Sequence, residues 1–264
     1  FTQPTAPAGI PLWAFRQTEE LKLVRHQINW WIDQRQVDYG DFGGGISDDS
    51  DLVQQWPALA LMGVDPDKIN RSITALADAA YRNGMFTNGL GTIETDELHA
   101  YEEGINTNSA LLLLNWGQPW AVERLMETVN ALHTIIKPNP QGHWLFSSNW
   151  FSGKKIYGEG NWEWQKPYSF PIMHPAIMLG EFNADRRSRN LVTKLADGYL
   201  AYGYTAEDGQ WTLPNEINWR TGATRGGEIQ RGGGLGLRGH PGVGDGLRRI
   251  GRRRPFHECQ HAAT

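Results

Sequence analysis

The feature that most constrains this fold is a repeated alternation of helix-forming stretches and short breaks. Apolar residues recur at three- and four-residue spacing, and Gly, Pro and Asn-Gly signals separate one stretch from the next. Strand-like alternation is scarce. The pattern predicts a mainly α protein of antiparallel helical hairpins, with helices over about 18–37, 49–62, 66–83, 96–115, 120–136, 170–182 and 185–202.

The sequence changes character after residue 220. Residues 221–264 are rich in Gly and Arg, lack apolar periodicity and contain eight arginines but three acids, whereas the whole chain has a net charge of −4. We therefore predict a helical domain over 1–220 and a disordered tail over 221–264. The tail reads either as out-of-frame translation of GC-rich DNA or as a genuine disordered arm. An RNA-binding arm would interleave aromatic residues, and only Phe256 is present.

The stretch 38–57 is a glycine-rich loop that runs into a helix. Three consecutive glycines, Gly43 to Gly45, exclude a helix or strand interior, and Ser47 or Asp48 is expected to cap the following helix. The positive end of that helix favours ionised carboxylates. We interpret Asp48 and Asp49 as candidate catalytic acids, although Asp51 alone reads as a surface residue. Asp38, Asp41 and Trp56 are candidate substrate contacts.

A second acidic cluster lies in the predicted helix 96–115. His99 is one helical turn from Glu102 and Glu103, so the three side chains can share a face, and Tyr101 lies between them. A His beside carboxylates can exchange protons near neutral pH. These four residues are candidate catalytic groups, and the alternative is a solvated helix face with an incidental His.

Aromatic residues gather in a long loop over 138–165. The chain has 12 Trp, and a Trp ring offers an apolar face and an N–H donor that suit a sugar ring. Tyr157, Trp162 and Trp164 are therefore candidate substrate contacts, unless the loop packs its own rings. His174 joins them as a candidate contact, although a lone His of this kind is more often structural than catalytic.

Several classes of protein are disfavoured by missing motifs. The sequence has no phosphate-binding Walker loop, nucleophile elbow or His-Glu-x-x-His pattern, and the glycine triplet follows no convincing strand. The aspartates lack the spacing of an EF-hand loop. One Cys excludes a disulfide framework and a multi-cysteine metal site. We expect no cofactor and no metal.

The hairpins, the Asp48-Asp49 pair at a helix start and the aromatic loops resemble the (α/α) toroid carbohydrate-active enzymes. These include six-hairpin glycosidases, among them unsaturated-uronyl hydrolases, and toroid polysaccharide lyases. The resemblance covers roughly 15–205 and implies an incomplete toroid, because the chain supplies fewer helices than a full ring needs. It implies acid and base roles for Asp48 and Asp49 in a hydrolase. In a lyase it implies proton removal by His99 and Tyr101, although the diagnostic Asn-His pair is absent.

The sequence therefore predicts a carbohydrate-active enzyme that cleaves a glycosidic bond in an oligo- or polysaccharide, possibly one containing uronic acid, by carboxylate acid–base hydrolysis. The alternatives are β-elimination by a His/Tyr pair and a noncatalytic helical glycan-binding or scaffold protein. We expect no nucleic-acid partner. We also expect no membrane partner, because no apolar run approaches a span of about 20 residues. A secreted or periplasmic location is expected, with a cytoplasmic one open, since the first residue is Phe1 rather than Met and a removed leader stays open.

Overall fold

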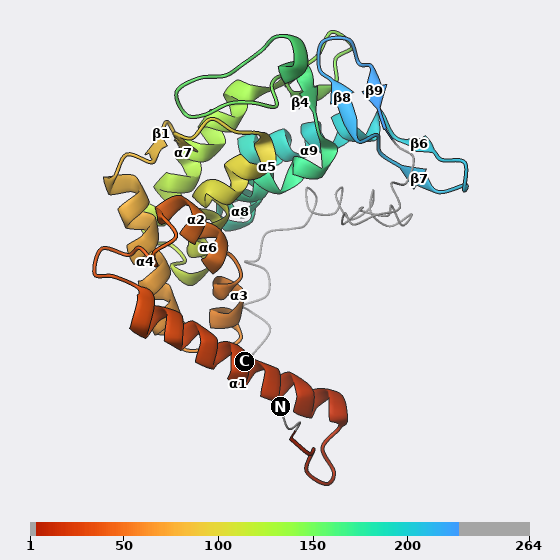
Figure 1. Cartoon of the computed structure of the whole chain (residues 1–264). Coiled ribbons are helices and arrows are strands. Elements are labelled where there is room, and N and C mark those ends of the chain that lie inside the picture. The colour runs from red at the N-terminus through yellow and green to blue at the C-terminus, as the bar shows by residue number, and fades with distance from the viewer. Residues whose placement is uncertain (1–3, 227–264) are drawn as a thin grey trace, which may run out of the picture.

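The computed structural model describes residues 4–226, apart from the side chain of Ser47. The predicted tail from residue 227 onward lies outside the described residues. The helices are arranged along an arc, with α1 at one end and the β8–β9 strands at the other (Figure 1). Within residues 4–226, no helix combines the length and the apolar character that crossing a membrane requires.

Helices make up most of the described chain, so the prediction of a mainly α fold is confirmed. The α-helices are α1 (Leu12–Trp30), α2 (Ile46–Val53), α3 (Trp56–Leu61), α4 (Pro66–Arg82), α5 (Glu97–Ala100), α6 (Asn106–Leu114), α7 (Pro119–Ile135), α8 (His174–Asn183) and α9 (Arg186–Leu200). Two π-helical segments, η1 (Trp31–Arg35) and η2 (Tyr101–Ile105), continue α1 and α5. Two 3-10 segments, η3 (Gly160–Glu163) and η4 (Pro167–Met173), precede α8.

The strands are short and pair antiparallel. Two hairpins join β1 (Phe86–Thr87) to β2 (Leu90–Gly91) and β3 (Ile136–Pro138) to β4 (Trp144–Phe146). A third joins β6 (Tyr204–Thr205) to β7 (Trp211–Thr212), and β8 (Glu216–Asn218) lies between β5 (Trp164–Gln165) and β9 (Thr224–Arg225). Because β9 pairs with β8, ordered structure continues past residue 220, where the sequence placed the end of the folded body.

The core has two clusters of buried apolar side chains. The larger one packs α7, α8 and α9 against β4, and includes Leu132, Phe146 and Leu195. The smaller one packs α3 and α4 beneath the glycine-rich loop and includes Phe42 and Trp56. Burial of such residues is the main stabilising contribution to a fold of this kind.

Trp56 belongs to that core rather than to a binding surface. Trp56 is 6% exposed, and its ring packs edge-on against the Phe42 ring with 5.4 Å between the ring centroids. A side chain enclosed in this way has no face left for a ligand. The burial counts against the substrate contact that the sequence predicted for Trp56.

The first helix begins earlier than predicted. It starts at Leu12, directly after Pro11, and Thr18 is an interior residue whose hydroxyl donates to the Ala14 carbonyl at 2.9 Å. Thr18 therefore is no N-cap, because a Thr hydroxyl can also bond the carbonyl four residues back within a helix.

The predicted helix over 49–62 is two helices. Pro57 lies in the first turn of α3, and the chain breaks at Gln54 and Gln55 before it. Pro57 has no N–H to donate to the Val53 carbonyl four residues back, and its ring crowds that carbonyl, so α2 cannot continue through this point. The predicted cap is also wrong, since α2 begins after Gly45, and Ser47 and Asp48 lie inside the helix.

The predicted helix over 96–115 is interrupted as well. Glu103 and Gly104 have non-helical backbone angles, with φ of 110° at Gly104, which only glycine adopts readily. A side chain at Gly104 would also meet the Phe86 ring at 2.9 Å. This kink separates α5 from α6 and sets the direction of the carboxylates on η2.

Candidate functional site

The candidate site forms where α2 packs against η2. The Ser50 hydroxyl donates to the Glu102 carbonyl at 2.5 Å, and the Thr107 hydroxyl donates to the Ser50 carbonyl at 3.2 Å. These contacts join two segments that are about fifty residues apart in the sequence. They bring the acidic face of α2 to the acidic face of η2.

Four carboxylates and one imidazole meet at this junction, and we call them the acid cluster: Asp48, Asp51, Glu102, Glu103 and His99. Burial raises the pKa of Asp51, and the nearby charge of Asp48 raises it further. Burial likewise raises the pKa of Glu102, with a contribution from Asp51. His99 opposes both shifts. Carboxylates that raise each other's pKa hold a proton at a higher pH than isolated ones.

Glu103 is the most enclosed acid of the η2 segment. Burial raises its pKa, and the charges of Asp48 and Asp51 add to the shift. Its Oε2 atom is buried and has no hydrogen-bond partner among residues 4–226. A buried carboxylate oxygen without a donor favours the protonated form, because the charged form loses its solvation. Glu103 is therefore suited to donate a proton.

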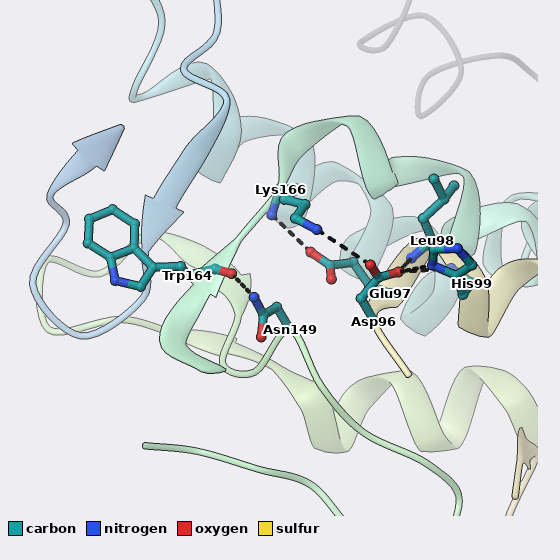
Figure 2. A network of polar contacts seen from close by, with 7 residues as sticks. All are labelled: Asp96, Glu97, Leu98, His99, Asn149, Trp164 and Lys166. Carbon is teal, nitrogen blue, oxygen red and sulfur yellow. Dashed lines mark hydrogen bonds and ion pairs between the residues drawn. The ribbon is translucent and has the colours of Figure 1, made fainter. Parts of the chain in front are cut away.

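His99 is held at the edge of the acid cluster by Asp96. The Nδ1 atom lies 2.9 Å from Asp96 Oδ1, and that hydrogen bond raises the pKa of His99. The same carboxylate accepts from the backbone N–H groups of Leu98 and His99, as the N-cap of α5. Figure 2 shows Asp96 between His99 and Lys166, whose Nζ lies 3.4 Å from Oδ2. Burial raises the pKa of Asp96, but the His99 and Lys166 contacts outweigh it and leave the pKa lowered.

Glu97 is a buried carboxyl beneath this network. It is 0% exposed, and its Oε1 accepts from the backbone N–H of Lys166 at 2.9 Å (Figure 2). Its Oε2 has no partner within the described chain. Burial raises the pKa of Glu97 from 4.5 to about 7, and Asp96 contributes to the shift. The sequence alone gave Glu97 no role, because an acid in a first helical turn normally faces solvent.

We expect Glu97 to make stability depend on pH. Its pKa is higher in the folded state, so the folded state binds the extra proton, and stability is greatest below about pH 4.5 and falls as pH rises to about 7. The full difference for this group is roughly 3 kcal/mol. Glu97→Gln keeps an oxygen acceptor and cannot ionise, so denaturant unfolding should show a flatter stability profile over this range.

Glu123→Gln on the exposed side of α7 is the matched control for that measurement and should leave the profile unchanged. A Glu97→Gln profile as steep as that of the parent chain would contradict the assignment of Glu97 as a neutral buried acid.

Asp49 and Asp41 lie apart from the acid cluster. Asp49 points back to the glycine-rich loop, where its two oxygens accept from the N–H groups of Phe42 at 2.6 Å and Gly44 at 3.2 Å. Asp41 accepts from the Gly43 N–H, and its charge adds to the raised pKa of Asp49, which is mainly due to burial. Asp49 therefore holds the loop closed, which counts against its predicted catalytic role. Asp38 is exposed on the same loop.

Tyr101 pairs with His174 rather than with His99. The Tyr101 hydroxyl lies 3.2 Å from His174 Nδ1, between η2 and the start of α8. Burial raises the pKa of Tyr101 and lowers the pKa of His174, so the pair is a neutral phenol beside a neutral imidazole. The sequence had assigned the two residues to different sites.

The aromatic loop brings some of its predicted contacts together. Trp162 is 38% exposed and lies near Tyr157, with 6.0 Å between ring centroids, and near Trp150, with 5.2 Å. We call these three side chains the aromatic platform. Trp164 is excluded from it, because the Arg225 guanidinium stacks 3.5 Å from the centroid of its ring.

No group of three or more His, Cys, Asp or Glu side chains among residues 4–226 is arranged to hold a metal ion. A scan against protein-family models gives no match to this chain, and a search of the curated proteins gives none either.

Sequence reasoning located part of this site. It selected His99, Glu102, Glu103 and Asp48, which the structure brings together, but it treated Asp51 as a surface residue. It used Asp96 only as a helix start and gave Lys166 no role. The N-cap position of Asp96, three residues before His99, was the available signal for the His99 contact.

Proposed function

We propose that this chain is a carbohydrate-active enzyme that hydrolyses a glycosidic bond with the carboxylates of the acid cluster. The observation that supports it is the meeting of α2 and η2 acids, of which Asp51, Glu102 and Glu103 have raised pKa values. Hydrolysis of this kind needs one carboxyl that keeps its proton and one that is ionised.

Glu103 is the proposed general acid, because its buried oxygen favours the protonated form. It would donate its proton to the glycosidic oxygen as the bond to the sugar carbon breaks. Asp48 is the proposed ionised partner, since it is exposed on α2 and its charge raises the pKa of Asp51 and of Glu103. It would take a proton from the attacking water or attack the sugar carbon directly.

The test is a turnover assay on a panel of neutral and acidic oligo- and polysaccharides. New reducing ends without near-ultraviolet absorbance would support hydrolysis. Binding without any new reducing end, across the whole panel, would contradict the proposal and favour a noncatalytic glycan-binding protein.

A second candidate is β-elimination on a uronide, and the Tyr101–His174 contact favours it. The neutral imidazole can accept the phenol proton as Tyr101 takes the proton beside the uronic carboxylate. Tyr101 then gives that proton to the leaving oxygen as the carbon–oxygen bond breaks and a carbon–carbon double bond forms. If this chemistry operates, Tyr101→Phe should lower turnover by roughly 10²–10⁴-fold.

The two chemistries are separated by their products. Elimination predicts a near-ultraviolet absorbing product whose formation Tyr101→Phe slows by that factor, with Tyr204→Phe on β6 as a control. A saturated product would exclude elimination and leave hydrolysis.

A further inference from the structure

A groove lies on the outer side of the β1–β2 hairpin. It has a volume of about 650 Å³ and is formed by β2, the second half of α7 and the loop that follows Ser152. That volume is within the range of ligand pockets, roughly 300–1,000 Å³. The groove is separate from the acid cluster, since none of the acid-cluster residues lines it.

The lining combines apolar, amide and cationic groups. Ile156, which is 41% exposed, supplies the apolar surface, and the buried side chains of Leu90 and Ala131 close the floor beneath it. Asn130 and Thr134 on α7 supply polar groups for hydroxyls. A flat apolar surface flanked by amides and hydroxyls suits the two faces of a sugar ring.

Two ammonium groups give the groove a positive charge. Lys154 and Lys155 line it against a single acid, Glu127, and neither lysine forms an ion pair with another residue of 4–226. Lys155 lies over the Tyr157 ring, 4.0 Å from its centroid. Lys154 is thus the lysine left available for a ligand anion, on a chain whose net charge is −4.

One strand residue, Gly91, lies between the groove and the acid cluster. The Gly153 N–H donates to the Gly91 carbonyl at 2.8 Å, and a side chain at Gly91 would lie 3.5 Å from the Glu103 Cβ. Gly91 therefore contacts the groove lining on one side and Glu103 on the other. At the other end, Lys155 connects the groove to Tyr157 of the aromatic platform.

We infer that this groove binds an anionic saccharide, with the charge of the sugar on Lys154 and its rings along Ile156 and the aromatic platform. The charge can be a carboxylate or a sulfate, because an ammonium recognises either as an anion. The inference rests on the proposed function, since it names the class of saccharide that the proposed enzyme would take.

The experiment measures dissociation constants by titration calorimetry on the Glu103→Gln chain, in which turnover is expected to be slow. The probes are linear diuronates of galacturonate, mannuronate and guluronate, sulfated galactose disaccharides, and the carboxyl-reduced and desulfated counterpart of each. Lys154→Gln tests the contact, Lys154→Arg retains the charge, and Lys137→Gln, exposed on β3 outside the groove, is the matched control.

At least one anionic probe should bind more tightly than its neutral counterpart, and Lys154→Gln should weaken it about tenfold, which corresponds to one charge-assisted hydrogen bond. Lys154→Arg and Lys137→Gln should bind as the parent does. Preference for the diuronates identifies a carboxylate, and preference for the sulfated sugars identifies a sulfate.

The inference is overturned if no anionic probe binds more tightly than its neutral form, or if Lys154→Gln binds as the parent does. Its failure differs from that of the proposed function. A chain that cleaves saccharides with an unchanged KM in Lys154→Gln retains the function and loses the groove assignment. A chain that binds through Lys154 but cleaves nothing retains the groove and loses the hydrolase.

Discussion

Replacing Glu103 with Gln is expected to lower the rate of glycosidic bond cleavage by roughly 10²–10⁴-fold, the usual contribution of a positioned general acid. Gln has nearly the same shape, but it carries no proton to give to the leaving oxygen. Because burial, Asp48 and Asp51 raise the pKa of Glu103, the rate of the parent chain should fall as pH rises through that raised pKa. The residual rate of Glu103→Gln should lack this limb.

The measurement is the release of reducing ends against pH on the best substrate of the panel. Glu207→Gln, at the exposed turn between β6 and β7, is the matched control and should retain the parent rate. Glu103 would be removed from the mechanism if its variant kept the parent rate and the parent pH profile. A substrate with an activated leaving group should lose less rate, because it needs less help from an acid.

Replacing Gly89 with Ala is expected to destabilise the fold by roughly 2–5 kcal/mol, from left-handed backbone strain plus overpacking. Gly89 has φ of 76° in the turn between β1 and β2, and an added Cβ would lie 2.3 Å from the Glu127 carbonyl carbon. The hairpin presses here on α7, where the Thr128 hydroxyl donates to the Gly89 carbonyl at 2.7 Å. The three nearest atoms all belong to the α7 backbone at Glu127 and Thr128, and a backbone atom cannot rotate away as a side chain can.

Gly84→Ala separates the two causes. Gly84 has φ of 68° at the end of α4, but nothing lies within 4 Å of an added Cβ. It should therefore show only the backbone strain, about 1–2 kcal/mol. Denaturant unfolding of both variants checks the difference. Equal losses of stability in the two variants would show that the β1–β2 hairpin can move away from α7.

Local sequence determined the long amphipathic helices. In α4 the buried positions Ile69, Ile73 and Leu76 recur at helical spacing, and Asp65-Pro66 marks the start, so a short window contains the whole signal. The helices α7 and α9 follow the same rule. This part could be predicted because helical periodicity is set by residues three and four apart, whatever they later pack against.

The breaks that position the site were not predicted. Gly104 reads as a tolerable helix interior residue, yet it adopts a positive φ next to Phe86 and turns Glu102 and Glu103 toward α2. Pro57 was passed over in the same way, although it ends the run that holds Asp48 and Asp51. A single Gly or Pro costs a helix only a few kcal/mol or less, so tertiary packing decides whether the helix continues.

The tertiary structure alone decided which side chains lie beside one another in the candidate site. The sequence selected acids by type and spacing, which placed Asp49 in the site and Asp51 outside it, whereas the packing of α2 on η2 reverses the two. The tertiary structure also joins Tyr101 on η2 to His174 on α8, and it encloses Glu97. Contacts between residues far apart in the chain depend on how whole elements pack, and a raised pKa depends on burial by those elements, so neither is written in a local pattern.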